Sequence, residues 1–254
     1  MNTKVNIAGV EFKNPVMVAS GTFGSGAEYG EFVDLNRLGA VVTKGVANVP
    51  WEGNPTPRIA ETYGGMLNAV GLQNPGYDLF AKRDIPYLQN YDTNIIVNVC
   101  GRTMEDYIDV VEKLGHESVD MLEINISCPN VKHGGIAFGQ DPKAVEAITK
   151  AVKAVAKQPV IMKLSPNVTD ITEMARAAEA GGADALSLIN TLTGMQIDVE
   201  RQKFVLANKT GGLSGPAIKP VAVRMVYQVA NAVKVPIIGM GGIASAKDAL
   251  EFIL

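Results

Sequence analysis

Short apolar runs alternate with helix-like segments along most of this 254-residue chain, and this alternation restricts the fold more than any other feature. Seven runs have the length and the continuous apolarity of strands that are covered on both faces. They are residues 15–19, 40–43, 95–99, 121–125, 160–164, 185–189 and 236–239. Seven such strands predict a parallel α/β sheet, either a (β/α)8 TIM barrel or a doubly wound open sheet.

Capping residues mark where the intervening helices begin. Thr103, Asp141 and Asp170 are preferred N-cap residues, and each precedes a stripe of apolar side chains at helical spacing. Residues 216–232 have the pattern of a further helix. We therefore expect helices between the strands, as the crossover connections of a parallel sheet require.

Residues at the ends of the strand-like runs decide between the two folds. Polar side chains or glycine occur at or just past each end: Ser20, Lys44, Asn98, Asn125, Lys163, Asn190 and Gly241. In a barrel all of these positions converge on one mouth, whereas in an open sheet they spread along an edge. The convergence of so many polar groups favours the barrel.

Several segments lie outside the repeating pattern. Residues 1–12 predict a hairpin that turns at residues 8–9 and plugs the opposite end of the barrel. Residues 45–92 are too long for a simple connection and predict inserted loops and small strands over the mouth, and residues 197–206 predict a second hairpin. The sequence ends within an apparent seventh helix, so we expect one barrel domain, residues 1–254, truncated before strand eight.

Composition excludes several classes of function. A formal charge of −3 gives no reason to expect a nucleic acid or an anionic membrane as a partner, and no apolar run has the length of a membrane span. Two cysteines and no secretion signal predict a reduced, cytoplasmic protein. His116 and His133 lack partners at ligand spacing, so we expect no metal site.

Two glycine-rich segments indicate a phosphate-bearing ligand. Residues 211–216 and 239–243 each predict a turn before a helix, where backbone N–H groups can approach a phosphate. Ordinary tight turns are the alternative for either segment alone. Together, and at the end of strand seven, they favour a phosphate site of the kind that barrel enzymes use.

Two lysines end strand-like runs, where burial is costly without a negative partner. Lys44 can instead exit to solvent, and Lys163 can pair with a buried carboxylate such as Glu123. The functional interpretation gives these lysines anionic partners, namely a flavin that becomes negative on reduction and a substrate carboxylate.

Amides surround one thiol near the middle of the chain. Cys128 lies between Asn125 and Asn130, and a thiol in that setting can act as a base or a nucleophile. A small buried hydrophobe is the alternative, and we assign that packing role to Cys100. The amides are Asn68, Asn98, Asn125, Asn130 and Asn190. Together they favour a ligand that offers both donors and acceptors, such as a pyrimidine ring.

Three segments in combination resemble one family. Residues 68–76, 125–130 and 211–220 resemble the class 1 dihydroorotate dehydrogenases, and the likeness extends from Val5 to the last residue. The Gly-Leu-Gln-Asn-Pro-Gly segment, residues 71–76, is similar to the form found in the 1B catalytic subunit. The class 2 enzymes carry a serine base and an N-terminal membrane helix, whereas this sequence has Cys128.

The resemblance implies an FMN-containing barrel that oxidises dihydroorotate to orotate in pyrimidine biosynthesis. It implies that Cys128 is the general base that takes the C5 proton while hydride leaves C6 for flavin N5. Lys163 then faces flavin N1 and O2, and Lys44 lies between the flavin and the substrate carboxylate. Such a thiol must be deprotonated in the productive complex.

The resemblance also assigns binding positions. For the substrate they are Lys44, Asn68, Val70, Gly71, Leu72, Asn125, Asn130, Asn190 and Thr191. For FMN they are Ala19, Ser20, Gly21, Thr43, Lys44, Asn98, Asn125, Lys163, Ile189, Gly215, Gly241 and Gly242.

Class 1B enzymes work with a partner subunit that carries FAD and a [2Fe–2S] cluster and passes electrons to NAD. Two cysteines are too few to hold such a cluster on this chain. The resemblance thus implies a homodimer within a heterotetramer. The residues leave three alternatives open: a dihydropyrimidine dehydrogenase-type flavoenzyme, a Schiff-base aldolase that uses Lys163, and a non-catalytic binding or scaffold protein.

Overall fold

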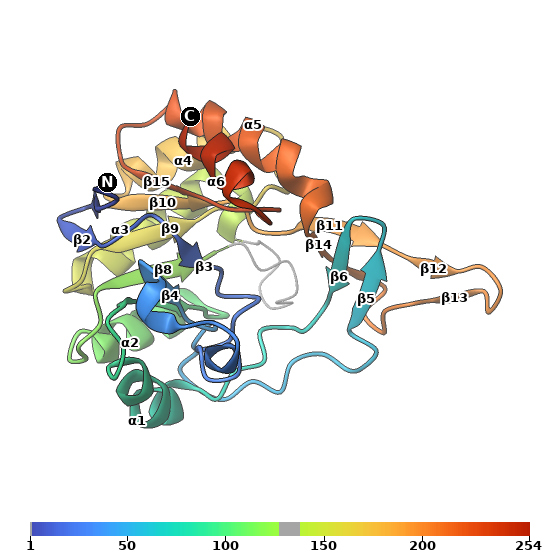
Figure 1. Ribbon diagram of the computed structural model, residues 1–254, viewed down its shortest axis with the longest axis horizontal. Helices are drawn as coiled ribbons and strands as arrows, with labels where there is room; N and C mark the ends of the chain where they lie inside the picture. Colours follow the sequence, from blue (N-terminus) through green and yellow to red (C-terminus); the bar gives the residue numbers. More distant parts are fainter. Residues whose placement is uncertain (1, 127–137) are drawn as a thin grey trace.

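A curled, seven-stranded parallel sheet forms the centre of the protein (Figure 1). The computed structural model describes residues 2–126 and 138–254. The strand order is β15-β10-β9-β8-β7-β4-β3, and every neighbouring pair is parallel. The strands are β3 (Met17–Val18), β4 (Ala40–Val42), β7 (Asn94–Val99), β8 (Met121–Asn125), β9 (Val160–Lys163), β10 (Ala185–Leu188) and β15 (Ile237–Gly239). All seven predicted strands are confirmed.

The arrangement is that of a TIM-barrel-like α/β fold, as the sequence predicts. Within the described residues the edge strands β3 and β15 do not pair with each other, so the sheet is an open curl. A strand eight beyond residue 254 stays a prediction.

Helices cover the outside of the sheet, and all of the α-helices except the last bury apolar side chains. They are α1 (Tyr77–Leu88), α2 (Met104–Leu114), α3 (Pro142–Val155), α4 (Ile171–Ala180), α5 (Lys219–Ala230) and α6 (Ala246–Ile253), with 3-10 helices η1 (Tyr29–Glu31), η2 (Leu35–Arg37), η3 (Phe138–Gln140) and η4 (Pro216–Ile218). The predicted caps are confirmed, because Thr103, Asp141 and Asp170 each accept a backbone N–H of the first turn.

Helix α1 lies within the long insertion, where the sequence predicts only loops and small strands. Its start carries Gly76 without a side-chain cap, and Pro86 interrupts its last turn. Both features are typical of a helix boundary and conceal the helix in the sequence. Burial of Phe80, Ile85 and Leu88 stabilises it in the folded protein.

A second, antiparallel sheet lies beyond one end of the parallel sheet (Figure 1). Its order is β11 (Leu192–Met195), β14 (Thr210–Ser214), β6 (Gly65–Asn68) and β5 (Ile59–Thr62), and the predicted hairpin extends from it as β12 (Ile197–Asp198) and β13 (Lys203–Phe204). The predicted turn at residues 211–214 is wrong, because these residues form β14, which pairs with β11 on one side and β6 on the other. A Cβ on Gly212 would lie 2.0 Å from Thr191 Oγ1, so its glycine serves close packing.

The N-terminal hairpin plugs the opposite end of the parallel sheet, as predicted. Its strands are β1 (Val5–Ile7) and β2 (Val10–Phe12), joined by Ala8 and Gly9 at positive φ. Phe12 is fully buried in a cluster with Ala40, Met121 and Ile161 near the starts of three strands. The strand ends that carry polar residues therefore face the second sheet (Figure 1).

Carboxylates complete the hydrogen bonding where two of the parallel strands begin. Asp184 Oδ2 accepts from the backbone N of Val160 at 2.7 Å and from Lys153 Nζ at 2.6 Å. Asp120 Oδ2 accepts from the backbone N of Ile95 at 2.7 Å. Asp184 directly precedes β10 and binds the start of β9, and Asp120 directly precedes β8 and binds the start of β7. Each aspartate therefore aligns two neighbouring strands at their starts.

We predict that Asp184→Ala destabilises the protein by about 1–3 kcal/mol, because the Val160 N–H loses its acceptor. The Asp109 carboxylate forms an exposed ion pair with Lys113 one helical turn away, so Asp109→Ala should change stability by less than about 0.5 kcal/mol. Urea unfolding of both variants measures the difference. Equal stability losses would contradict the proposed role of Asp184.

Candidate functional site

A buried carboxylate links the polar side chains inside the sheet. Glu123 on β8 is 1% exposed, and its Oε1 accepts from Asn98 Nδ2 at 2.6 Å. Its Oε2 accepts from Ser187 Oγ at 2.8 Å, and Lys163 Nζ lies 3.5 Å from Oε1. The alternative in which Lys163 pairs with Glu123 is therefore confirmed. The sequence alone could have identified Glu123 as part of a buried network, because a carboxylate is unusual in an otherwise apolar strand. The sequence gives no comparable signal for Ser187.

The same network reaches residues that were predicted to bind a cofactor. Lys163 Nζ donates to Ser20 Oγ at 3.2 Å, and the side chain of Ser20 follows β3. Thr43 Oγ1, just after β4, accepts from the backbone N of Asn98 at 3.3 Å. Ser20, Thr43, Asn98 and Lys163 thus form one group, as the prediction of a common mouth requires.

One acceptor in this group lacks a partner. Asn98 Oδ1 is buried and accepts no hydrogen bond from the described part of the chain. A Cβ on Gly45 would lie 2.8 Å from this oxygen, so only glycine fits beside it. An unpaired buried acceptor is costly, and a donor from a bound molecule would satisfy it.

A second group joins the parallel sheet to the antiparallel one. Asn125 Oδ1 accepts from Asn190 Nδ2 at 3.4 Å, and Asn190 Oδ1 accepts from the backbone N of Thr191 at 2.7 Å. Asn68 Nδ2 donates to the Gly212 carbonyl at 3.4 Å, on the strand that packs against Thr191. The described amides that were predicted to bind substrate therefore lie on adjoining segments.

Asn167 supports this second group. Its Nδ2 donates to the Thr191 carbonyl at 3.0 Å, and its Oδ1 accepts from the backbone N of Thr193 at 2.9 Å. The sequence indicates only a turn residue next to proline, because these partners are about 25 residues away along the chain.

The predicted substrate loop is held by Asn54 and Asn74, whose Nδ2 atoms donate to the carbonyls of Ala69 at 2.9 Å and Leu72 at 2.8 Å. Gly71 and Leu72 both have positive φ, and the Val70 carbonyl accepts from the backbone N of Asn54 at 3.0 Å. Leu72 packs against a buried cluster that includes Cys100, which is 0% exposed. This burial agrees with a packing role for Cys100.

Three glycines form a cradle at the start of η4 and α5. Gly215, Gly241 and Gly242 have φ of 103°, 125° and 75°. A Cβ on Gly242 would lie 2.7 Å from the Gly215 carbonyl oxygen, and one on Gly241 would lie 3.3 Å from Ile189 Cγ1. The N–H groups of Gly241 and Gly242 donate to no acceptor among the described residues, whereas those of Ala217 and Ile218 in η4 donate to the carbonyls of Gly64 and Gly215. Neighbouring unpaired backbone N–H groups such as those of the two glycines can bind an anion.

Three further residues that the sequence predicts for the site, Ala19, Gly21 and Lys44, lie just after β3 or β4. The Ala19 carbonyl accepts from the backbone N of Thr22 at 3.1 Å, and Gly21 is exposed. Lys44 is half-buried, and its backbone N donates to the Gly24 carbonyl at 2.8 Å. Cys128 and Asn130 lie outside the described residues.

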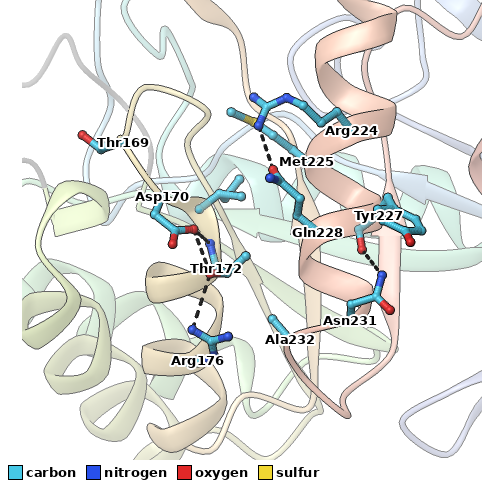
Figure 2. Close-up of a pocket in the computed structure, with 11 residues that line it drawn as sticks. Thr169, Asp170, Thr172, Arg176, Arg224, Met225, Tyr227, Gln228, Asn231 and Ala232 are labelled. Atoms are coloured by element: carbon cyan, nitrogen blue, oxygen red, sulfur yellow. Dashed lines mark hydrogen bonds between the residues drawn. The ribbon is translucent and has the colours of Figure 1, made fainter.

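A cavity of about 660 Å³ between α4 and α5 is separate from these groups (Figure 2). None of the predicted site residues lines it. The two arginines in its wall have partners on their own helices, because Arg176 contacts Thr172 and Arg224 donates to Gln228. We therefore place the candidate site at the strand ends rather than in this cavity.

The residues that the structure describes contain no cluster of three side chains able to hold a metal ion. No helix among them is both long and apolar enough to span a bilayer.

A family model for dihydroorotate dehydrogenase matches residues 2–254. The chain belongs to this family. A Lachnoclostridium phytofermentans protein named dihydroorotate dehydrogenase B (NAD(+)), catalytic subunit is 73% identical over 254 residues, which are 100% of this chain and 85% of that protein. Proteins of the same name from Alkaliphilus metalliredigens and Geobacter sulfurreducens are 72% and 59% identical, and the matches cover 100% and 98% of this chain and 84% and 82% of those proteins.

These names confirm the resemblance to the class 1B catalytic subunit. The fold also matches a crystal structure of a family member from Eimeria tenella in complex with ferulenol. The match has a TM-score of 0.77 and 24% identity, and it covers 99% of this chain and 76% of that one. At that identity it shows the fold alone.

We predict that Glu123→Gln destabilises this family member by about 3–5 kcal/mol, because buried Lys163 loses its counter-charge. The double variant Glu123→Gln/Lys163→Met should recover most of that loss, since no unpaired charge remains. Urea unfolding measures both. A single variant as stable as the unmodified protein would show that the ion pair has no such role.

Proposed function

We propose that this protein oxidises dihydroorotate to orotate in de novo pyrimidine biosynthesis, as the catalytic subunit of an NAD-linked dihydroorotate dehydrogenase. The observation that carries the proposal is the 73% identity, over the whole chain, to a protein with that name. Curated relatives at 57–73% identity carry the same name, so the proposal does not depend on one comparison.

We propose FMN as the cofactor, because two features of the site fit its parts. The glycine cradle at Gly215, Gly241 and Gly242 offers the unpaired N–H groups of Gly241 and Gly242 to a phosphate. The unpaired Oδ1 of Asn98 offers an acceptor to a hydrogen-bond donor on the ligand. Ala19, Ser20, Gly21, Thr43, Lys44, Asn125, Lys163 and Ile189 complete the proposed binding set. When bound, FMN supplies an acceptor for the hydride of the substrate.

The protein's own groups have distinct roles in the proposed reaction. Cys128 takes the proton from C5 of dihydroorotate, which requires a thiolate. Lys44 binds the substrate carboxylate. Lys163 is held by Glu123 and Ser20, and it places positive charge beside the flavin, which becomes negative on reduction. The substrate ring is oriented by Asn68, Val70, Gly71, Leu72, Asn125, Asn130, Asn190 and Thr191.

The proposed protein transfers electrons to a second subunit. The names of the relatives specify a catalytic subunit and NAD(+), which supports a separate electron-transfer partner. We propose that this partner carries FAD and a [2Fe–2S] cluster. We propose a homodimer within a heterotetramer, residues 1–254 as one FMN-binding barrel domain, and a cytoplasmic location.

The alternatives left open by the residues have less support. A Schiff-base aldolase needs a neutral, reachable amine, whereas Lys163 is 5% exposed and paired with Glu123. A scaffold protein has no need for the unpaired acceptor of Asn98. Dihydropyrimidine dehydrogenase-type activity differs only in its substrate, so an experiment separates it.

We predict that the purified protein with FMN shows a flavin absorption band that bleaches when dihydroorotate is added without oxygen. Dihydrouracil should leave the band unchanged, because it lacks the carboxylate that Lys44 is proposed to bind. Anaerobic absorption spectroscopy measures both. Bleaching by dihydrouracil alone would support the alternative dehydrogenase.

We predict that Cys128→Ala slows flavin reduction by dihydroorotate about 10²- to 10⁴-fold, the usual contribution of a general base. Orotate should still bind, since the amides remain. Cys100→Ala is the matched control, because it removes the other thiol from an apolar cluster and should leave reduction rates nearly unchanged. Stopped-flow measurement of flavin reduction compares the two, and an unaltered rate in Cys128→Ala would contradict the base assignment.

A further inference from the structure

An ion pair ties the loop after β15 to the start of α5. Lys219 is the first residue of α5, and its Nζ lies 2.6 Å from Asp248 Oδ1 and 2.9 Å from Glu251 Oε2 on α6. The second oxygen of Asp248 accepts from the backbone N of Ala244 at 3.1 Å and from Ser245 Oγ at 2.8 Å. One carboxylate therefore holds both the lysine and the loop.

The lysine also contacts the glycine cradle directly. A Cβ on Gly242 would lie 2.9 Å from Lys219 Cβ and 3.0 Å from the Lys219 backbone N. The contacts close a ring, because Gly242 packs on Lys219, Lys219 binds Asp248, and Asp248 binds Ala244 two residues after Gly242. This ring fixes the position of residues 240–245, the cradle loop after β15, relative to α5.

The ion pair is intact across the neutral range of pH. Hydrogen bonds from Lys219, from Ser245 and from the Ala244 N–H lower the pKa of Asp248 well below its usual value. Hydrogen bonds to Asp248 and Glu251 raise the pKa of Lys219 above its usual value. The contribution of Asp248 is therefore lost only in strong acid, and that of Lys219 only in strong alkali. Because two carboxylates already neutralise Lys219, its ammonium is a poor candidate for a direct phosphate ligand.

We propose that the Lys219–Asp248 ion pair is a positioning element of the phosphate subsite. It fixes the loop after β15 on Lys219, so that the N–H groups of Gly241 and Gly242 stay together and reach the same phosphate. This inference rests on the proposed function, in which that phosphate belongs to FMN. Neither side chain touches the ligand.

A direct electrostatic role makes the opposite prediction for Asp248. Removing a carboxylate near a phosphate reduces repulsion and strengthens binding, whereas releasing the loop weakens it. The side chains of Lys219 and Asp248 are 21% and 19% exposed, and Lys219 and Glu251 line a cavity of about 590 Å³ beside α5. Water can therefore reach the pair, so substitution leaves no fully buried charge and the variants should fold.

The test compares FMN with riboflavin, which lacks the phosphate. Each flavin is titrated into the flavin-free full chain, and flavin fluorescence gives the dissociation constant. For Asp248→Ala we expect FMN to bind about tenfold to a hundredfold more weakly, as when one or two charge-assisted hydrogen bonds are misplaced. Riboflavin binding should stay within about twofold.

Two further variants complete the design. Glu251→Gln is the matched control, because it removes a carboxylate that binds Lys219 but forms no hydrogen bond with residues 240–245 of the described chain. The affinity of this variant for FMN should match that of the unmodified protein. Lys219→Met should weaken FMN binding in the same way as Asp248→Ala, and it decides the matter if circular dichroism shows that Asp248→Ala is unfolded.

Each result has one meaning. If the unmodified protein does not bind FMN, both the proposed function and this inference are overturned. If it binds FMN and Asp248→Ala binds FMN equally well or better, the inference fails while the proposed function stands. Equal losses for FMN and riboflavin would overturn the phosphate-specific role, because they indicate a general loosening of the fold.

Discussion

The buried ion pair between Glu123 and Lys163 is the interaction on which the arrangement of the strand ends depends. Two charges inside the sheet are stable only when each has a partner and the remaining lone pairs and protons form hydrogen bonds. Glu123 meets this condition by accepting from Asn98 and Ser187, and Lys163 meets it by donating to Ser20. The network thus joins strands β7, β8, β9 and β10 and reaches the segment after β3.

This constraint has a consequence for chemistry. A lysine held between a carboxylate and a hydroxyl keeps its position, so its charge can be directed at a ligand without a costly rearrangement. Glu123 also fixes Asn98 by accepting from its Nδ2, and the Oδ1 atom of Asn98 then has no partner among the described residues. The polar interior of the sheet therefore provides both a stable scaffold and an unsatisfied acceptor, which is the combination expected of a preformed cofactor site.

The antiparallel sheet provides the other side of the site. Asn68 and Gly212 come from its central strands, and Thr191 and Asn190 lie just before β11. Asn167 links the segment after β9 to the same region through two hydrogen bonds. The candidate substrate groups are therefore positioned by contacts between segments that are far apart in the sequence, and the glycine cradle is positioned in a similar way by Lys219 and Asp248.

Local signals in the sequence were sufficient for the regular elements of the parallel sheet. Continuous apolar runs predicted all seven strands, and Thr103, Asp141 and Asp170 predicted three helix starts, because strand burial and N-capping depend on residues close together in the chain. The same reasoning missed α1, whose Gly76 and Pro86 are typical of boundaries, and it placed a turn where Gly211 and Gly212 form a strand.

The amino-acid sequence by itself determined the family. It also determined which polar residues or glycines follow each strand and which residues are available for chemistry. Only the tertiary structure decided that Lys163 pairs with Glu123, that Ser187 completes this network, and that Asp248 connects the cradle loop to α5. Partners such as Lys163 and Ser20 are separated by 143 positions. Contacts at such separations arise when the sheet curls, and no local pattern of residues encodes them.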